Sequence, residues 1–472
     1  MSRRMISSLC GISLLAALPA VSQTPKAPQD AINGSEPRHV ILIIGDGMDD
    51  QQITIARNYL AGATGRLELD KLPLRSTSQI LTIQDKENGK PVYVADSANT
   101  ATSIATGKVT SRGRISTTAG SDLDIPTIVE LASAAGFKTG IVTTASVTDA
   151  TPSAFAAHIS YRLCENPELI LDITYSGIHL GECKVDLKSN GGKGSIAEQL
   201  AESSLDILLG GGGKHFALKA EDGSTSLLEM AQNNGFSTVA NTAQMSNVPP
   251  DNRLLGLFSP DDMPVKLRGE DGRVAESPEP SILNRVHEYL GDVTQPAPMR
   301  CEPNPEFASV PTLKAMTDTA LAHLAHNNDR GFFLMVESAS IDKQSHERNP
   351  CGSIGEVEQL NEALRSALAF AAQHPRTLIM VTADHAQAAQ LIPYESLFSE
   401  YPIPIYTPGK IARLITPEGS HLAVNYATTT FQMEEHTGAN VPLFGNRESL
   451  GLVPPFVQQP QLFEISRQYL GL

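Results

Sequence analysis

Three acidic residues stand where apolar segments of the chain end. Asp46, Glu337 and Asp384 each close or directly follow a run rich in Val, Ile, Leu or Phe, and His385 comes next to the last of them. Such runs predict buried strands, and parallel strands deliver the residues at their carboxyl ends to one edge of a sheet. Carboxylates crowded at one edge repel one another unless a cation lies among them. These residues therefore predict a metal site.

A second pair of candidate metal ligands has helical spacing. Asp342 and His346 are four residues apart, so on a helix their side chains face the same way and can bind one ion. A surface hydrogen bond between the two is an equally common alternative. His436, which precedes Thr437 and Gly438, is a further candidate ligand, although a histidine at such a place is also typical of a turn.

Ser97 is the candidate nucleophile. It lies in 94–100, before a glycine-free run that ends at Gly107, which places it at or near the start of a helix. A serine there can simply cap the helix. The same position favours a bound phosphate, and a metal ion can activate a hydroxyl that is otherwise a weak nucleophile. Arg162 can bind two phosphate oxygens, and a disulfide at Cys164 would help to fix it, although an arginine in a loop is by itself usually solvated.

The elements that must position these residues alternate along the chain. The pattern predicts a helix ended by glycine at 128–135, and strands at 39–44, 139–143, 206–209, 331–337 and 377–382. Strands alternating with helices indicate an α/β fold with a mostly parallel central sheet that helices flank on both faces. In such sheets ligands bind beyond the carboxyl ends of the strands.

The N-terminus has the pattern of a signal peptide, expected at 1–22. Arg3 and Arg4 precede an apolar run at 9–20 that is too short to span a bilayer, and small residues follow it. A buried N-terminal helix is the alternative, and both the general secretory and the twin-arginine export routes fit. Residues 23–37 predict a flexible lead-in. We therefore expect a periplasmic or secreted protein, and no later segment predicts a membrane anchor.

Four cysteines remain beyond the expected signal, and an even number favours disulfides in an exported protein. Cys164, Cys183, Cys301 and Cys351 allow three pairings, among which the sequence does not choose. Short loops favour Cys164–Cys183 and Cys301–Cys351. A zinc–thiolate site is the rival interpretation, but the C-x-x-C spacing is absent.

The composition argues against nucleic-acid binding. There are 36 Lys and Arg against 52 Asp and Glu, a net charge of -16, and only 5% of residues are aromatic. A phosphorylated substrate therefore needs a local reversal of charge. The glycines at 210–213 and Lys214 resemble part of a P-loop, but Leu208 and His215 replace residues that the motif requires, so a strand-to-helix turn is expected there.

Six separated motifs, in order along the chain, resemble those of the bacterial alkaline phosphatases. They are Asp46-Gly47-Met48, the segment around Asp96-Ser97-Ala98, Asp149-Ala150-Thr151-Pro152, 336–343, Thr382-Ala383-Asp384-His385 and His436-Thr437-Gly438. The resemblance runs from about Arg38 to Leu472 and includes the four cysteines. It implies a single alkaline phosphatase-like catalytic domain over 38–472 that hydrolyses small phosphate monoesters.

The resemblance also implies two zinc ions and one magnesium ion per chain. It assigns the first zinc ion to Asp342, His346 and His436, the second to Asp46, Asp384 and His385, and the magnesium ion to Asp46, Thr151 and Glu337. It further implies Ser97 as a nucleophile that becomes phosphorylated, Arg162 as a phosphate ligand, and Asp149 with Lys343 as a pair acting through water. The pairings Cys164–Cys183 and Cys301–Cys351, a homodimer and a periplasmic location belong to the same implication.

Three features depart from the family pattern. Gln387 stands where a histidine that orients a zinc ligand is common, and Asp49 where a glycine is usual. The segment at 391–421, expected to be a cap-like insertion over the site, differs most, so substrate preference is not implied. A phosphodiesterase or a sulfatase on the same sheet is the nearest alternative, although the C-x-P-x-R motif of sulfatases is absent. A non-enzymatic metal- or phosphate-binding protein is the second alternative.

Overall fold

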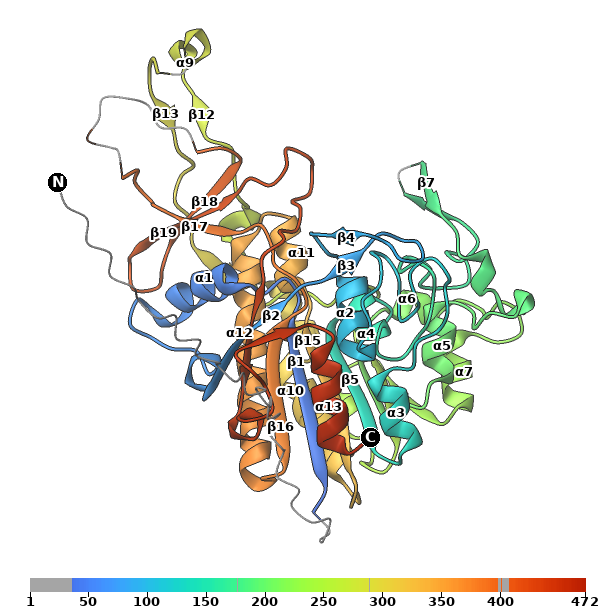
Figure 1. Cartoon of the computed structure of the whole chain (residues 1–472). Coiled ribbons are helices and arrows are strands. Elements are labelled where there is room, and N and C mark those ends of the chain that lie inside the picture. Colours follow the sequence, from blue (N-terminus) through green and yellow to red (C-terminus); the bar gives the residue numbers. More distant parts are fainter. Residues whose placement is uncertain (1–35, 176, 288, 398–399, 401–406) are drawn as a thin grey trace, which may run out of the picture. The chain divides into compact units, whose positions relative to one another are not determined.

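Unbroken aliphatic runs form the middle of a ten-stranded sheet (Figure 1). The computed structural model describes residues 36–472 except 176, 288, 398–399 and 401–406. The expected strands are β1 (Arg38–Gly45), β5 (Lys138–Ser146), β8 (Ile207–Gly211), β15 (Gly331–Ser338) and β16 (Thr377–Ala383). The expected signal peptide at 1–22 and most of the lead-in at 23–37 lie outside the described residues, and both stay predictions.

Nearly all neighbouring strands of this sheet are parallel. The other five strands are β2 (Leu74–Gln79), β9 (Phe236–Val239), β10 (Arg253–Leu257), β20 (Val441–Gly445) and β21 (Phe456–Gln458). The order is β21-β2-β20-β16-β1-β15-β5-β8-β10-β9. Only β20 runs against its neighbours, β16 and β2. The predicted α/β fold with a mostly parallel sheet is confirmed.

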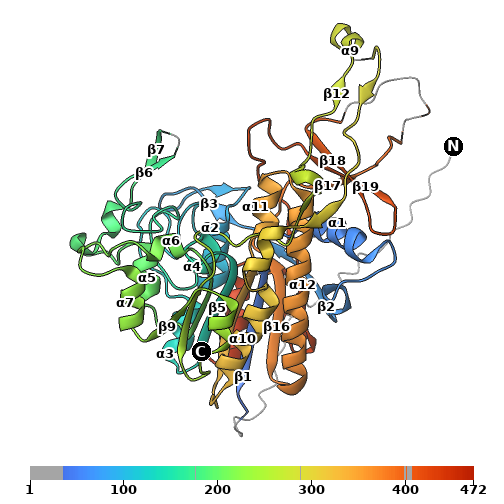
Figure 2. The same cartoon turned by 180° about the vertical axis from the view of Figure 1, so that it is seen from behind.

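Helices cover both faces of the sheet because successive side chains of each central strand point to opposite faces. Ile41 and Ile43 of β1 pack with one set of helices, and Val40, Leu42 and Ile44 pack with the other. The first set, seen in Figure 2, is α1 (Asp50–Ala61), α10 (Leu313–Ala325), α11 (Ser340–His346) and α12 (Pro350–Gln373). The second, in front in Figure 1, includes α2 (Ser97–Thr106), α3 (Ile128–Ala134), α4 (Ala150–Ser153), α5 (Ile196–Glu202), α7 (Leu227–Asn233) and α13 (Gln461–Leu470).

The strand register places the acidic residues at one rim. Gly45, the last residue of β1, pairs with Ser338 of β15 on one side and with Ala383 of β16 on the other. Asp46, Glu337 and Asp384 are each within one residue of these positions. The prediction that the three carboxylates meet at the carboxyl ends of parallel strands is therefore confirmed.

Smaller elements lie outside the main sheet. β17 (Gln390–Ile392), β18 (Lys410–Ile415) and β19 (His421–Tyr426) form an antiparallel sheet. This sheet contains the two ends of the expected insertion at 391–421, whose role as a cap stays a prediction. The remaining short strands are β3 (Thr82–Ile83), β4 (Pro91–Val92), β6 (Ile173–Tyr175), β7 (Ile178–Gly181), β11 (Leu267–Gly269), β12 (Glu279–Pro280), β13 (Val293–Thr294) and β14 (Cys301–Pro303). The remaining short helices are α6 (Gly213–Phe216), α8 (Thr242–Ser246) and α9 (Ile282–Val286).

The cysteine pairing and the glycine run also follow expectation. Cys164–Cys183 and Cys301–Cys351 both form disulfides. β8 ends at Gly211 and α6 begins at Gly213, with Gly212 between them at φ 95°, a backbone conformation that favours glycine. The run is thus a strand-to-helix turn. Across the described residues, no helix is both long enough and apolar enough to cross a membrane.

Candidate active site

Asp342, His346 and His436 come together as a first donor cluster. His346 Nε2 lies 3.0 Å from His436 Nε2, and each ring lies 3.3 Å from an oxygen of Asp342. Both Nδ1 atoms face backbone carbonyls: that of His346 is 2.5 Å from Glu434 O and that of His436 is 2.9 Å from Ala95 O. A ring that donates from Nδ1 keeps the Nε2 lone pair free, so both lone pairs point into the cluster.

A second donor cluster lies beside the first. His385 Nε2 is 3.3 Å from Asp46 Oδ1 and 3.4 Å from Asp384 Oδ2, and all three residues are buried. The His385 ring stacks on that of His436 with 3.8 Å between centroids, so the two clusters are neighbours. The oxygens and nitrogens of Asp46, Asp384 and His385 lie close enough to share one metal ion.

Ser97 lies against the second cluster. It is the first residue of α2 and is 3% exposed, and its Oγ is 3.1 Å from His385 Nε2. The alternative that Ser97 only caps the helix is wrong, because Asp96 is the cap: Asp96 Oδ1 accepts from Asn99 N, and Asn99 Oδ1 accepts from Asp96 N. The Ser97 hydroxyl is therefore left free for another task at the N-terminus of this helix.

Glu337 and Thr151 are the remaining predicted metal ligands. Thr143 Oγ1 donates to Glu337, and burial raises the pKa of Glu337 to about 8. Burial and then neighbouring carboxylates raise the pKa of Asp46 well above its usual range. Asp46 Oδ1 and Thr151 Oγ1 are buried, and neither has a hydrogen-bond partner among the residues that the structure describes. Buried oxygens of this kind without a donor fit a cation as their missing partner, so these residues fit the metals that the sequence suggests.

The charges within the first cluster also favour a bound cation. Although burial opposes both charges, His346 and His436 hold the pKa of Asp342 well below its usual range, and Asp342 raises the pKa of His436 to about 9. The carboxylates thus stabilise positive charge at this place. A divalent cation bound here would satisfy the same attraction.

Arg162 is held by carboxylates at the edge of the site. Its NH2 donates to Asp149 Oδ1 at 3.0 Å and its NH1 to Asp96 Oδ2 at 3.5 Å. Lys343 donates to the other oxygen of Asp149 and lies 3.3 Å from Asp262. Lys343 and then Arg162 hold the pKa of Asp149 below its usual range despite burial. Arg162 thus keeps its charge and its orientation in a chain of ion pairs.

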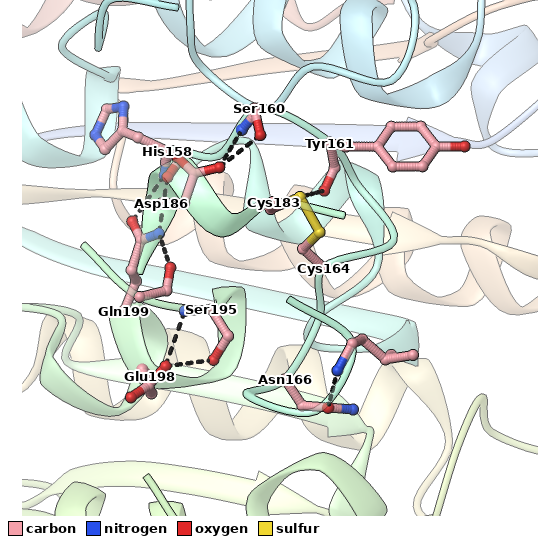
Figure 3. The surroundings of a disulfide bond; sticks show 12 residues. His158, Ser160, Tyr161, Cys164, Asn166, Cys183, Asp186, Ser195, Glu198 and Gln199 are labelled. Atoms are coloured by element: carbon pink, nitrogen blue, oxygen red, sulfur yellow. Dashed lines mark hydrogen bonds between the residues drawn. A yellow bond between two sulfur atoms is a disulfide. The ribbon is translucent and has the colours of Figure 1, made fainter. Parts of the chain in front are cut away.

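Figure 3 shows the Cys164–Cys183 disulfide next to Tyr161, and Arg162 comes directly after Tyr161 in the sequence. Cys164 N donates to Tyr161 O, Cys183 Sγ lies 3.7 Å from the same oxygen, and Arg162 N donates to Gly113 O. The disulfide and these backbone bonds therefore fix the turn that carries the guanidinium.

Removing this disulfide should weaken binding of inorganic phosphate. In Cys164→Ser with Cys183→Ser, the Arg162 turn gains freedom, and we expect a higher inhibition constant for phosphate with a stability loss of about 2–4 kcal/mol. Replacing Cys301 and Cys351 together is the matched control, because that bond joins β14 to α12 and contributes nothing to the Arg162 turn. An equal change in phosphate inhibition in both double variants would contradict this prediction.

Gln387 and Asp49, the two departures from the family pattern, form one chain of contacts. Gln387 Nε2 donates to Asp342 Oδ1 at 2.6 Å, so the glutamine orients the carboxylate as the usual histidine is expected to. Asp49 caps α1 through Gln51 N and Gln52 N, and its Oδ2 accepts from Gln387 N. The two departures therefore support each other.

Removing the Gln387 amide should loosen Asp342. For Gln387→Leu we expect metal affinity to fall about 10- to 100-fold, because the carboxylate loses the donor that fixes it. Competition against a chelator of known zinc affinity measures this. Gln387→His keeps a donor and should bind close to wild type, whereas wild-type affinity in the leucine variant would contradict the role.

A cavity of about 580 Å³ opens onto these residues. Its lining includes Ser97, Arg162, Asp342, Lys343, His346 and His436. The two clusters hold all six predicted zinc ligands, and Ser97 and Gln387 contact them through His385 and Asp342. Arg162, Asp149 and Lys343 form the ion pairs at the edge of the site. Asp96, Asp262 and Thr143 also support the site, although the predictions from the sequence assigned them no role. Asp96 had a signal as an aspartate before an expected helix start, and Thr143 as the end of an expected strand, whereas Asp262 had none.

The fold and the donor set define an α/β protein with a candidate metal centre next to a buried serine. A model of the family described as "Alkaline phosphatase" matches residues 37–442. The chain is 38% identical to an alkaline phosphatase of Escherichia coli (strain K12), over 94% of this chain and 88% of that one. It is also 38% identical to streptomycin-6-phosphate phosphatase of Streptomyces griseus, over 92% and 91%.

A solved structure shares the fold. The alkaline phosphatase of the Antarctic bacterium TAB5 superposes with a TM-score of 0.64 at 22% identity, covering 92% of this chain and 98% of that one. The chain belongs to the alkaline phosphatase family, as the motifs predicted. Membership confirms the expectation of a phosphoric monoester hydrolase.

Proposed function

We propose that the protein hydrolyses phosphate monoesters through a phosphoserine formed on Ser97, at a site for two zinc ions and one magnesium ion. The observation that carries this proposal is the position of the Ser97 hydroxyl, buried at a helix N-terminus and 3.1 Å from His385 in a cluster of metal-type donors. This hydroxyl does not cap the helix, because Asp96 does.

The proposed ligands are those that the sequence suggests. Asp342, His346 and His436 would hold one zinc ion; Asp46, Asp384 and His385 the second; and Asp46, Thr151 and Glu337 the magnesium ion. When bound, such ions lower the pKa of a hydroxyl or water and stabilise negative charge on phosphoryl oxygens. Asp46 Oδ1 and Thr151 Oγ1, buried and without a hydrogen bond among the described residues, support this assignment.

The protein groups then have distinct tasks. Ser97 Oγ loses its proton and attacks phosphorus, forming the serine–phosphate bond as the bond to the leaving oxygen breaks; the leaving oxygen gains one proton and departs as the alcohol, so no net proton is lost. Water later attacks the same phosphorus, the bond to Ser97 Oγ breaks, one proton of that water goes to Ser97 Oγ, and inorganic phosphate is released. Arg162 binds two phosphoryl oxygens, and the N–H groups at the start of α2 favour the same negative charge. Asp149 and Lys343 keep the guanidinium in place.

The proposed ions also account for an anionic substrate at an anionic protein. Asp46, Glu337, Asp342 and Asp384 together carry less negative charge than three divalent cations carry positive charge, and Arg162 adds to the balance. The pocket is then locally cationic, while repulsion from the rest of the surface is screened beyond about 8 Å at physiological salt.

Substrate class is tested by comparing rates. We expect an aryl phosphate monoester to be hydrolysed much faster than the matching phosphate diester or sulfate ester, because Arg162 suits a terminal phosphoryl group with free oxygens. A preference for the diester or sulfate would indicate one of the alternative hydrolases, and tight phosphate binding without turnover would indicate a binding protein. Periplasmic export and a homodimer remain part of the proposal.

A further inference from the structure

A buried ion pair lies next to the two histidines of the first cluster along the chain. Arg348 Nε donates to Glu434 Oε2 at 2.6 Å, and the side chains are 4% and 0% exposed. Among the Arg and Lys ion pairs of the described residues, this is the most deeply buried. It joins the end of α11 to the loop at 428–437, which precedes β20.

Both partners fasten the loop through further hydrogen bonds. Arg348 NH1 donates to Gln432 O at 2.7 Å and NH2 to Phe431 O at 2.8 Å. The second oxygen of Glu434 accepts from Thr428 N, Thr428 Oγ1 and Thr429 N. The residues at 428–436 form no helix or strand. These side-chain hydrogen bonds therefore satisfy backbone groups that a helix or strand would otherwise pair.

The ion pair is tied directly to the candidate metal ligands. Arg348 is two residues after His346, and Glu434 is two residues before His436. The backbone of Glu434 bonds twice to His346: Glu434 N donates to His346 O at 2.9 Å, and His346 Nδ1 donates to Glu434 O. The second bond is the one that leaves the His346 Nε2 lone pair facing His436.

The backbone of Arg348 has an unusual conformation. Its φ is 60°, a left-handed conformation that is uncommon for a residue other than glycine. Such a conformation persists where the surrounding contacts over-determine it. Here the guanidinium, with four acceptors on the loop, supplies those contacts.

We infer that Arg348 and Glu434 are positioning residues that hold His346 and His436 together for one zinc ion, an inference that rests on the proposed function. A buried ion pair is a weak source of stability, since apolar side chains of similar volume pack as well. The pair instead fixes the backbone conformation of a loop that lacks secondary structure. Any change in that conformation moves His436 relative to His346.

Arg348→Met and Glu434→Gln test the inference. Methionine keeps much of the arginine stem, and glutamine keeps an oxygen for Thr428. We expect affinity for one zinc ion to fall about 10- to 100-fold while the second remains tightly bound, as for other residues that orient metal ligands. Chelator competition and the visible spectrum of the cobalt-substituted protein measure this without activity. Excess zinc should restore kcat.

Arg253→Met is the matched control. Arg253 also fastens backbone carbonyls, those of Ser203, Leu205 and Asn234, but it lies at the start of β10, at the opposite end of that strand from the site. We expect a lower melting temperature with unchanged zinc affinity. The inference is overturned if zinc affinity in both site variants moves no further than in Arg253→Met.

A double variant keeps the test decisive if a single one fails to fold. Arg348→Met combined with Glu434→Gln leaves no unpaired buried charge. Wild-type zinc affinity in that folded variant also overturns the inference. A wild-type protein that binds no zinc and hydrolyses no phosphate monoester would instead overturn the proposed function, so the two failures are distinguishable.

Discussion

Ser97→Ala should abolish the phosphoenzyme and lower kcat/KM for an aryl phosphate by at least about 150-fold, equivalent to about 3 kcal/mol of transition-state stabilisation. The reason is that the variant lacks the only atom that forms the proposed bond to phosphorus. The remaining donors still bind phosphate, so residual hydrolysis by water is expected. Steady-state rates and acid-quenched labelling with radioactive phosphate measure the two effects.

Ser103→Ala is the matched control for this prediction. Ser103 is also a buried serine of α2, but its hydroxyl donates to the carbonyl of Asn99 within the helix. We expect near wild-type turnover and normal labelling for it. Wild-type turnover in Ser97→Ala would show that the nucleophile is another group, and unchanged labelling would show that phosphate is attached elsewhere.

The parts of the site that the sequence predicted are those set by strand ends. Asp46, Glu337 and Asp384 follow buried runs whose apolar character is strong enough to mark strands, and parallel pairing then brings them to one rim. Nothing about side-chain geometry was needed for that step. Ser97 was predictable for a similar reason, because helix starts have a local signal.

Other parts depend on contacts that no local pattern reveals. Arg162 is held by Asp149 and Asp96, which are 13 and 66 residues away along the chain. Arg348 and Glu434 are 86 residues apart, and each alone resembles an ordinary surface charge. Their pairing follows from how α11 and an irregular loop meet, which depends on tertiary packing rather than on periodicity.

Metal removal is the second prediction with a large expected effect. After treatment with EDTA and desalting, we expect phosphomonoesterase activity to fall to the level of Ser97→Ala or below, and to return when zinc and magnesium are added together. The physical reason is that bound cations would neutralise the crowded carboxylates of Asp46, Glu337 and Asp384 and would stabilise the negative charge on the phosphoryl group, whereas protons on the same carboxylates relieve their repulsion without supplying that charge. Elemental analysis before and after treatment gives the metal content per chain.

Stability separates this prediction from the one on Ser97. A ligand that binds only the folded protein stabilises it by about 2.7 kcal/mol when its concentration is 100 times its dissociation constant, so re-added metals should raise the melting temperature. Because Ser97→Ala keeps all the proposed ligands, its melting temperature should respond to chelation as that of the wild type does. If EDTA leaves both activity and melting temperature unchanged, the buried carboxylates do not hold metal ions, and the chemistry assigned to them is wrong whatever the result at Ser97.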